Sequence, residues 1–157
     1  MIYATEQDMI GRFGAEELSR LTDIAMPPEA PDEAKIFVAI MDASSLADTY
    51  LSRRYALPIK GCANPAGGGD LVPPPVLTRI VCDLARYNLY TDITKEHEAY
   101  QRRADALRLL ESIAVGNISL GCPLGDTAAL EISATDSGET ISAFSPREIA
   151  DADLRGY

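Results

Sequence analysis

Apolar side chains recur at the helical period in the first three quarters of this 157-residue chain. The longest predicted helix opens at Pro31, with acidic side chains in its first turn and Arg53 and Arg54 in its last, and ends near Tyr55, before Pro58. Its apolar positions fit a repeat of 3.6 residues. They are Ile36, Ile40, Ala43, Ala47, Tyr50 and Leu51.

Two short helices are predicted ahead of it. Thr5 is a candidate N-cap with Asp8 three residues later, close to the spacing of a capping box, and Gly14 offers a C-terminal stop. The second short helix, Glu16 to Leu21, ends before "MPPEAP", whose three prolines break the chain.

Two more helices are predicted after a loop. Residues 58–73 are rich in glycine and proline, so their composition predicts a loop. "PPPVL" then begins a helix with an apolar flank that includes Leu77 and Leu84. Thr94 is the candidate N-cap of the last helix, "KEHEAYQRRADALRLLESIAVG", which Gly116 ends.

The pattern changes after Leu120. Two weak strand candidates, residues 129–134 and 140–144, flank "TDSGE", a candidate hairpin turn. The sequence therefore predicts a mainly α fold: a small bundle of four or five helices over residues 1–121, with an extended C-terminal tail over 122–157 that can form a β-hairpin. We expect a neighbouring chain to order this tail, with Phe144, Leu154 and Tyr157 among its contact residues.

Charge restricts the possible partners. The net charge is −10, and residues 122–157 hold seven acidic and two basic side chains. Such acidity opposes adhesion to phosphate backbones or anionic membranes. The longest apolar run, "IFVAIM", is too short to span a bilayer, and the N-terminus lacks the pattern of a signal peptide. We therefore expect no membrane association.

The three cysteines and the single histidine do not form the pattern of a metal or cofactor site. The three cysteines show no CxxC spacing, which predicts reduced thiols and a cytoplasmic protein. Cys82 beside an apolar stripe is expected in the core, and His97 on a solvated helix face. Without a close ligand pair, the cysteines and His97 predict no zinc site. We expect neither metal nor cofactor.

No catalytic motif is present either. "NPAGGGD" has neither the preceding strand nor the Lys-Ser/Thr of a phosphate-binding loop, and "ISLGCPLG" is not a nucleophile elbow. No nucleophile, base and oxyanion site can be assembled from the pattern. The sequence thus predicts a protein that is not an enzyme.

Two arginine–tyrosine clusters are the most distinctive feature of the helical part. They comprise Arg53, Arg54 and Tyr55, and then Arg86 and Tyr87. A tyrosine ring can be buried while the neighbouring arginine pairs with a carboxylate, for which the local candidates are Asp42, Asp48 and Asp83. Clamping of helices is favoured over contact with a partner protein, and stacking on nucleic acid comes third because the chain is acidic.

Four segments resemble the Mu-like phage head–tail connector family, in the same order. They are "YATEQDMIGRFGAEELSRLTD", "DASSLADTYLSRRYALP", "PPPVLTRIVCDLARYNLY" and "RRADALRLLESIAVGNISLG", within residues 2–121, and the closing "FSPREIADADLRGY" is also similar. The resemblance implies a virion structural protein without catalytic residues, located at the neck between head and tail after assembly in the host cytoplasm.

The same resemblance implies a set of partners. Such adaptors form a closed homo-oligomeric ring of about 12 copies under the portal protein. A tail-completion (stopper) or tail terminator protein attaches below, and genomic DNA passes through the ring without specific binding. The competing interpretation is a small helical phage- or prophage-encoded binding or regulatory protein, also without catalytic activity.

Overall fold

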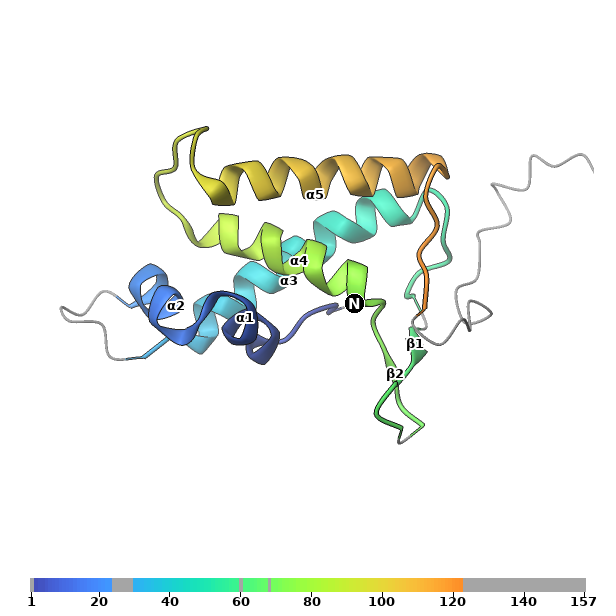
Figure 1. Cartoon of the computed structure of the whole chain (residues 1–157), viewed down its shortest axis with the longest axis horizontal. Coiled ribbons are helices and arrows are strands. Elements are labelled where there is room, and N and C mark those ends of the chain that lie inside the picture. The colour runs from blue at the N-terminus through green and yellow to red at the C-terminus, as the bar shows by residue number, and fades with distance from the viewer. Residues whose placement is uncertain (1, 24–29, 60, 68, 123–157) are drawn as a thin grey trace, which may run out of the picture.

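The structure is a computed structural model that describes residues 2–23, 30–59, 61–67 and 69–122. This part of the chain contains five helices and one small two-stranded sheet, so the mainly α fold is confirmed (Figure 1). The predicted hairpin in the tail, residues 129–144, lies outside the described residues.

Helices α1 (Glu6–Phe13) and α2 (Ala15–Thr22) form as the local signals predict. The Thr5 side chain accepts a hydrogen bond from the Asp8 N–H at 3.2 Å, and the Asp8 carboxylate accepts one from the Thr5 N–H at 2.8 Å. This capping box satisfies two of the backbone donors that the first turn leaves free. Gly14 separates the two helices.

Helix α3 (Glu33–Leu51) begins two residues after the predicted start at Pro31. Asp32 is its N-cap, and the Asp32 carboxylate accepts hydrogen bonds from the backbone N–H groups of Ala34 and Lys35. Its predicted end was wrong: Arg53 and Arg54 follow the helix instead of forming its last turn. The chain turns after Leu51, and this turn carries Tyr55 into the core.

The predicted loop after α3 was also partly wrong, since it contains two short antiparallel strands. Strand β1 (Cys62–Ala63) pairs with β2 (Leu71–Val72) in the register Cys62 to Val72 and Ala63 to Leu71. Strands of two residues are too short to leave an alternating pattern in the sequence. Gly61 has φ +95°, and a Cβ there would lie 2.8 Å from the Val72 carbonyl oxygen, so the hairpin requires glycine at this position.

Helix α4 (Pro75–Leu89) has proline in its first turn, as predicted, and α5 (Glu98–Val115) ends at Gly116, whose φ is +91°. The start of α5 differs from the prediction. His97, not Thr94, is the N-cap, and its Nδ1 accepts a hydrogen bond from the Ala99 N–H at 3.1 Å. His97 is therefore a half-buried capping residue and not part of a solvated helix face.

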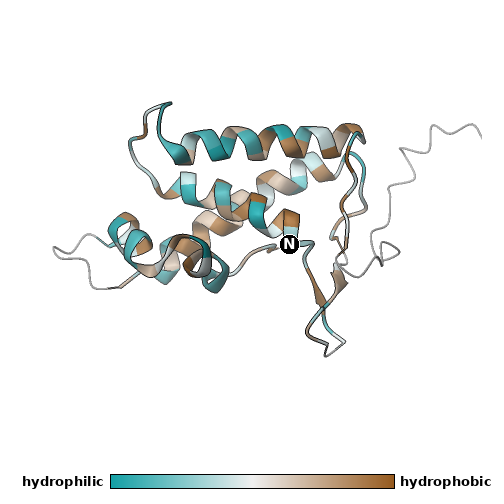
Figure 2. Cartoon of the chain, viewed as in Figure 1, coloured by the Kyte–Doolittle hydropathy of each residue, from teal (hydrophilic) through white to brown (hydrophobic). Residues whose placement is uncertain are grey.

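The core lies between α3, α4 and α5. Helices α4 and α5 run antiparallel and α3 crosses them, while α1 and α2 lie together near the N-terminal end of α3 (Figure 1). The buried side chains are mostly aliphatic or alanine, which agrees with an aromatic content of only 6%. Apolar positions concentrate where these helices meet (Figure 2). The largest include Met9, Leu18, Ile36, Ile40, Leu77, Ile80, Leu84 and Leu110.

The expectation that all the cysteines are reduced was wrong. Cys62 and Cys122 form a disulfide with a Cα–Cα distance of 5.4 Å, although 60 positions separate them in the sequence. The segment after α5 reaches the neighbourhood of β1 (Figure 1). Cys122 in this segment is therefore close enough to Cys62 of β1 for their sulfur atoms to be bonded. Spacing rules detect pairs that are close in sequence, so they miss a pair that only the tertiary fold makes.

None of the helices in the described residues is long and apolar enough to cross a bilayer.

Candidate functional site at the arginine–tyrosine clusters

Tyr55 ties the end of α3 to the segment that follows α5. Its side chain is buried, and its hydroxyl oxygen accepts a hydrogen bond of 2.9 Å from the Leu120 N–H. Both residues belong to the core cluster. The contact joins two parts of the chain that lie 65 positions apart, so Tyr55 acts as a clamp within the molecule.

Arg54 packs over this clamp. Its guanidinium carbon lies 5.9 Å from the centre of the Tyr55 ring, and its Nη1 occupies the space that a Cβ at Gly116 would need. None of the predicted carboxylates pairs with it: Asp48 accepts a hydrogen bond from the Tyr3 hydroxyl instead. Within the described residues, the buried Nε of Arg54 has no hydrogen-bond partner.

Arg53, the third member of this cluster, is exposed. It lines a shallow groove with Tyr50 of α3 and Glu111 and Val115 of α5. In the part of the chain that the structure describes, no carboxylate lies within ion-pair distance of Arg53. Its charge is therefore directed to the surface and not to an internal clamp.

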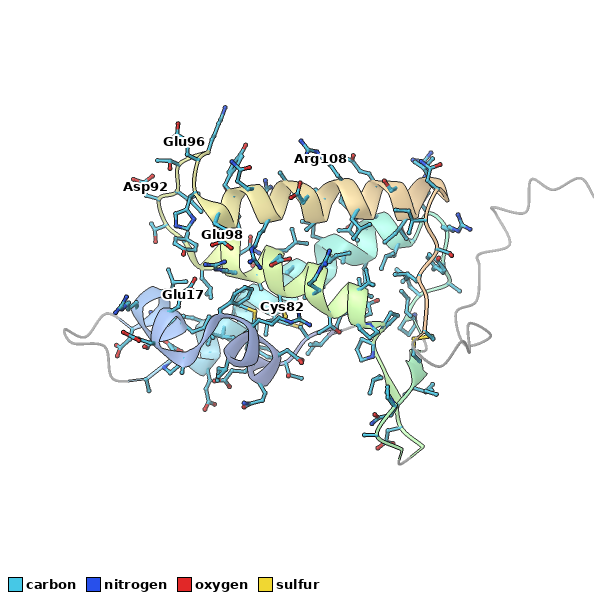
Figure 3. The ribbon with its side chains drawn as sticks, viewed as in Figure 1. Glu17, Cys82, Asp92, Glu96, Glu98 and Arg108 are labelled. Carbon is cyan, nitrogen blue, oxygen red and sulfur yellow. A yellow bond between two sulfur atoms is a disulfide. The ribbon has the colours of Figure 1, made fainter. Side chains whose placement is uncertain are left out.

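The second cluster is centred on Arg86, which joins α4 to three other helices. Its Nε donates to Glu17 of α2 at 2.7 Å, its Nη1 lies 3.9 Å from Glu98 of α5, and its guanidinium carbon lies 4.7 Å from the centre of the Phe13 ring of α1. Tyr90 donates from its hydroxyl to the same Glu17 oxygen at 3.3 Å. Figure 3 shows Glu17 and Glu98 near the same end of α4.

The pKa values in this cluster follow from burial and from Glu17. Burial alone would lower the pKa of Arg86, but the hydrogen bond and charge of Glu17 outweigh it and raise that pKa. Burial, together with the negative charge of Glu17, also raises the pKa of Tyr90. Both groups therefore stay protonated at neutral pH and donate to the carboxylate.

Tyr87 packs against α5. Its ring lies edge-on to Tyr100, with ring centres 6.2 Å apart, and the Arg103 guanidinium carbon lies 4.6 Å from its centre. Asp83, predicted as a partner for the arginines, lies 3.6 Å from Arg102 of α5 instead. Burial raises the pKa of Asp83, although Arg102 and Arg79 partly oppose this effect.

The structure thus places four of the predicted contact residues in clamps between helices: Arg54, Tyr55, Arg86 and Tyr87. Arg53 alone among the five described ones points to the surface. Phe144, Leu154 and Tyr157 lie outside the described residues. A role in contact with other chains stays a prediction for all eight.

The sequence is similar to proteins of phage Mu and its relatives. The model of the family "Bacteriophage Mu, Gp36" matches residues 3–137, most of the chain. The chain belongs to this family. It is 39% identical over 123 residues to the Mu-like prophage FluMu protein gp36 of Haemophilus influenzae, and 31% identical over 121 residues to Gene product J of Escherichia phage Mu. Each alignment covers 77% of both chains.

This Gp36-family chain has one free cysteine within the described residues. Cys82 is buried where α4 faces α1, as the apolar stripe predicts (Figure 3). Burial raises the pKa of its thiol to about 12, so at neutral pH it is protonated and a poor nucleophile. No group of three potential metal ligands is found in the part of the chain that the structure describes.

Sequence reasoning missed Glu17 and the cysteine pair. Glu17 receives hydrogen bonds from Arg86 and Tyr90, which lie 69 and 73 positions away. No local spacing signals such a contact. A half-buried carboxylate in a short helix could have been selected only as one of many possible partners.

Proposed function

We propose that this chain is a virion structural protein: a head–tail connector that forms a ring under the portal and joins the DNA-filled head to the tail. The observation that carries the proposal is the match to the phage Mu Gp36 family over residues 3–137. The finer role, as an adaptor at the neck, comes from the resemblance of four ordered segments to connector proteins.

The architecture suits such a role. The clamps at Tyr55 and Arg86 hold the helices of a small body in fixed positions, as a subunit under mechanical load requires. The net charge of −10 is compatible with DNA that passes through a ring without adhering to it. The disulfide is compatible with a particle that leaves the cell, because virion surfaces are oxidising environments.

The proposed partners are the portal protein above, a stopper or tail terminator protein below, and further copies of this chain in the ring. We propose no catalytic activity. The clustered side chains within the described residues are engaged in packing and ion pairs, and the buried thiol is not ionised.

A null allele of the gene tests this function. Infected or induced cells that lack the protein should accumulate DNA-filled heads and complete tails that do not join, and the wild-type gene supplied in trans should restore joined particles. Normal particle yield without the protein would exclude the connector role. Altered phage gene expression with normal morphogenesis would favour the alternative, a small regulatory or binding protein.

A further inference from the structure

Residues 36–41 of helix α3, "IFVAIM", are all apolar, so this part of the helix carries apolar side chains on its outer side as well as its inner side. Ile36, Ala39 and Ile40 face the core and are buried, whereas Phe37 and Val38 point outward and are 54% and 56% exposed. A surface helix normally has a polar outer face, and one that is apolar all round belongs inside an assembly. The outer side of α3 therefore lacks a partner in the isolated chain.

This outer side forms the first of two faces. The proximal face comprises Ile2, Glu6, Glu33, Phe37 and Met41, in which Phe37 borders an apolar groove of about 620 Å³ beside the N-terminal segment. Val38 lies outside this face, in a separate groove that Lys35 also lines. Both acidic residues line the groove beside Phe37, and none of the described residues that line it is basic. Within the described residues neither Glu6 nor Glu33 is within ion-pair distance of a cationic side chain. The groove therefore presents an apolar floor and an unneutralised negative rim.

A second face lies at the other end of α3. The distal face comprises Tyr50, Arg53, Glu111, Val115 and Ile118, around a smaller groove of about 240 Å³. Val115 is 63% exposed and projects beside it. Among the described residues, no carboxylate lies within ion-pair distance of Arg53. Glu111 also lines this groove, so the distal face is balanced in charge while the proximal groove is negative.

The two faces lie far apart on the molecule. Thirteen residues of α3 separate Phe37 from Tyr50, which corresponds to about 20 Å along the helix axis. The faces also differ in residues and in charge. A contact that joins two different faces of identical chains is head-to-tail, and repeating it generates a ring or a filament. A two-fold contact would instead pair each face with itself.

We infer that the proximal face of one copy binds the distal face of the next, with Arg53 of one chain against Glu33 and Glu6 of its neighbour. Val115 then packs against the apolar floor beside Phe37. The existence of a ring is taken from the proposed function, whereas the contact between neighbouring copies is inferred from the two faces. The pairing of Arg53 with two carboxylates, and of exposed Val115 with the apolar floor, favours this occupant.

The chain's own tail is a poorer occupant for the proximal groove. Residues 122–157 carry seven acidic and two basic side chains, and this excess would meet the carboxylates of Glu6 and Glu33. Juxtaposed like charges disfavour a contact. The distal face instead provides an exposed apolar side chain and a cation together.

Paired cysteines test the contact. In a variant with Phe37→Cys and Val115→Cys, a short bismaleimide should link neighbouring copies into a covalent ladder, in phage particles and in concentrated purified protein. The native thiols should not interfere, since Cys62 and Cys122 are bonded and Cys82 is buried. Each single variant is the control. It should give no ladder, because a head-to-tail contact does not bring two copies of one face together.

Charge reversal provides an independent test in the same cysteine background. Glu33→Arg or Arg53→Glu alone should reduce the cross-linked product about tenfold, and the two together should restore much of it. Arg108→Glu is the matched control, since Arg108 is exposed on α5 and belongs to neither face; it should leave the product unchanged.

Several results would overturn the inference. No ladder in the double-cysteine variant, a dimer from either single variant, or links only to a different protein would each exclude the head-to-tail contact. An immunoblot of the particles separates this failure from failure of the proposed function. A protein absent from particles that still forms the ladder when purified would retain the contact and lose the connector role.

Discussion

At the scale of single residues, the stability of the body depends on a few charged side chains that the fold has enclosed. Arg86 is the main example, with only 9% of its side chain exposed while Glu17, its partner, is 31% exposed. Removing one member of such a pair costs more than the pair itself contributes, because the other charge stays behind without its partner.

Arg86→Met should lower the free energy of unfolding by roughly 1.5–3 kcal/mol, the range for hydrogen bonds to charged groups. The stem of methionine preserves the packing, so the loss reports on the guanidinium. Urea denaturation followed by circular dichroism measures it. Arg108→Met is the control: its pair with Asp105 is exposed on both sides and should contribute at most about 0.5 kcal/mol. Equal effects of the two substitutions would contradict a special role for Arg86.

Asp83 gives a prediction for pH dependence. Its pKa is raised in the folded protein, chiefly by burial, so folding favours its protonated form. Wild type therefore loses stability as pH rises from about 4 through the raised pKa of Asp83 in the folded protein. Asp83→Asn should have a higher urea midpoint than wild type at pH 7 and the same midpoint near pH 3.

The control for this prediction is Asp105→Asn on the exposed surface of α5, which should change the urea midpoint little at pH 7 because its pair with Arg108 is exposed. An Asp83→Asn protein that is less stable than wild type at pH 7 would show that the attraction to Arg102 outweighs the cost of burial.

At the scale of elements, local chemistry predicted where most helices begin and end. The capping box at Thr5, the proline at the start of α4 and the glycine after α5 act within one turn, so the sequence alone reveals them. The predictions that failed concern features that depend on more than one turn of the chain. The β-hairpin depends on pairing across a loop. His97 is the cap because a turn from Thr94 leads into it, its own backbone is extended, and its ring packs edge-on against Tyr90.

The residues of the candidate site were likewise predicted only in part. The sequence identified the arginines and tyrosines of both clusters, because adjacent residues of these types are conspicuous. It did not identify their partners, since Glu17, Leu120 and Gly116 become neighbours only when the helices pack. Of the predicted partners, Asp48 binds Tyr3, and Asp83 lies near Arg102.

The disulfide between Cys62 and Cys122 gives a prediction for the stability of the protein. Replacing both Cys62 and Cys122 by alanine should lower the free energy of unfolding by about 2–4 kcal/mol, because the unfolded chain regains the freedom of a long loop. Reductant should shift the unfolding midpoint of wild type in the same direction and leave the double variant unchanged. A wild-type midpoint that does not respond to reductant would show that the bond does not stabilise the body.

At the scale of the whole molecule, we expect the helical body and the acidic tail that follows it to have separate roles. The body has its own core within residues 2–122, and the apolar tail residues, Phe144 and Tyr157 among them, are predicted to serve contacts with other chains. Removing the tail should therefore impair contacts with other chains without unfolding the body.

Deleting residues 123–157, with Cys122 kept, should leave the helical circular dichroism and the cooperative unfolding of the body intact. The same deletion should abolish the joining of heads to tails in a complementation assay. The full-length gene expressed at the same level is the control. Full complementation by the truncated chain would make the tail dispensable, and loss of cooperative unfolding would show that the body needs the tail to fold.

The central claim, that the protein is a connector in the neck of the particle, is tested most directly by imaging the neck. A cryo-electron microscopy reconstruction of purified particles without imposed icosahedral symmetry should show a ring between portal and tail whose repeating unit fits α3, α4 and α5. Particles from the truncated gene should yield unjoined heads. A neck whose density is fully explained by other proteins, with no place for this helical body, would contradict the account.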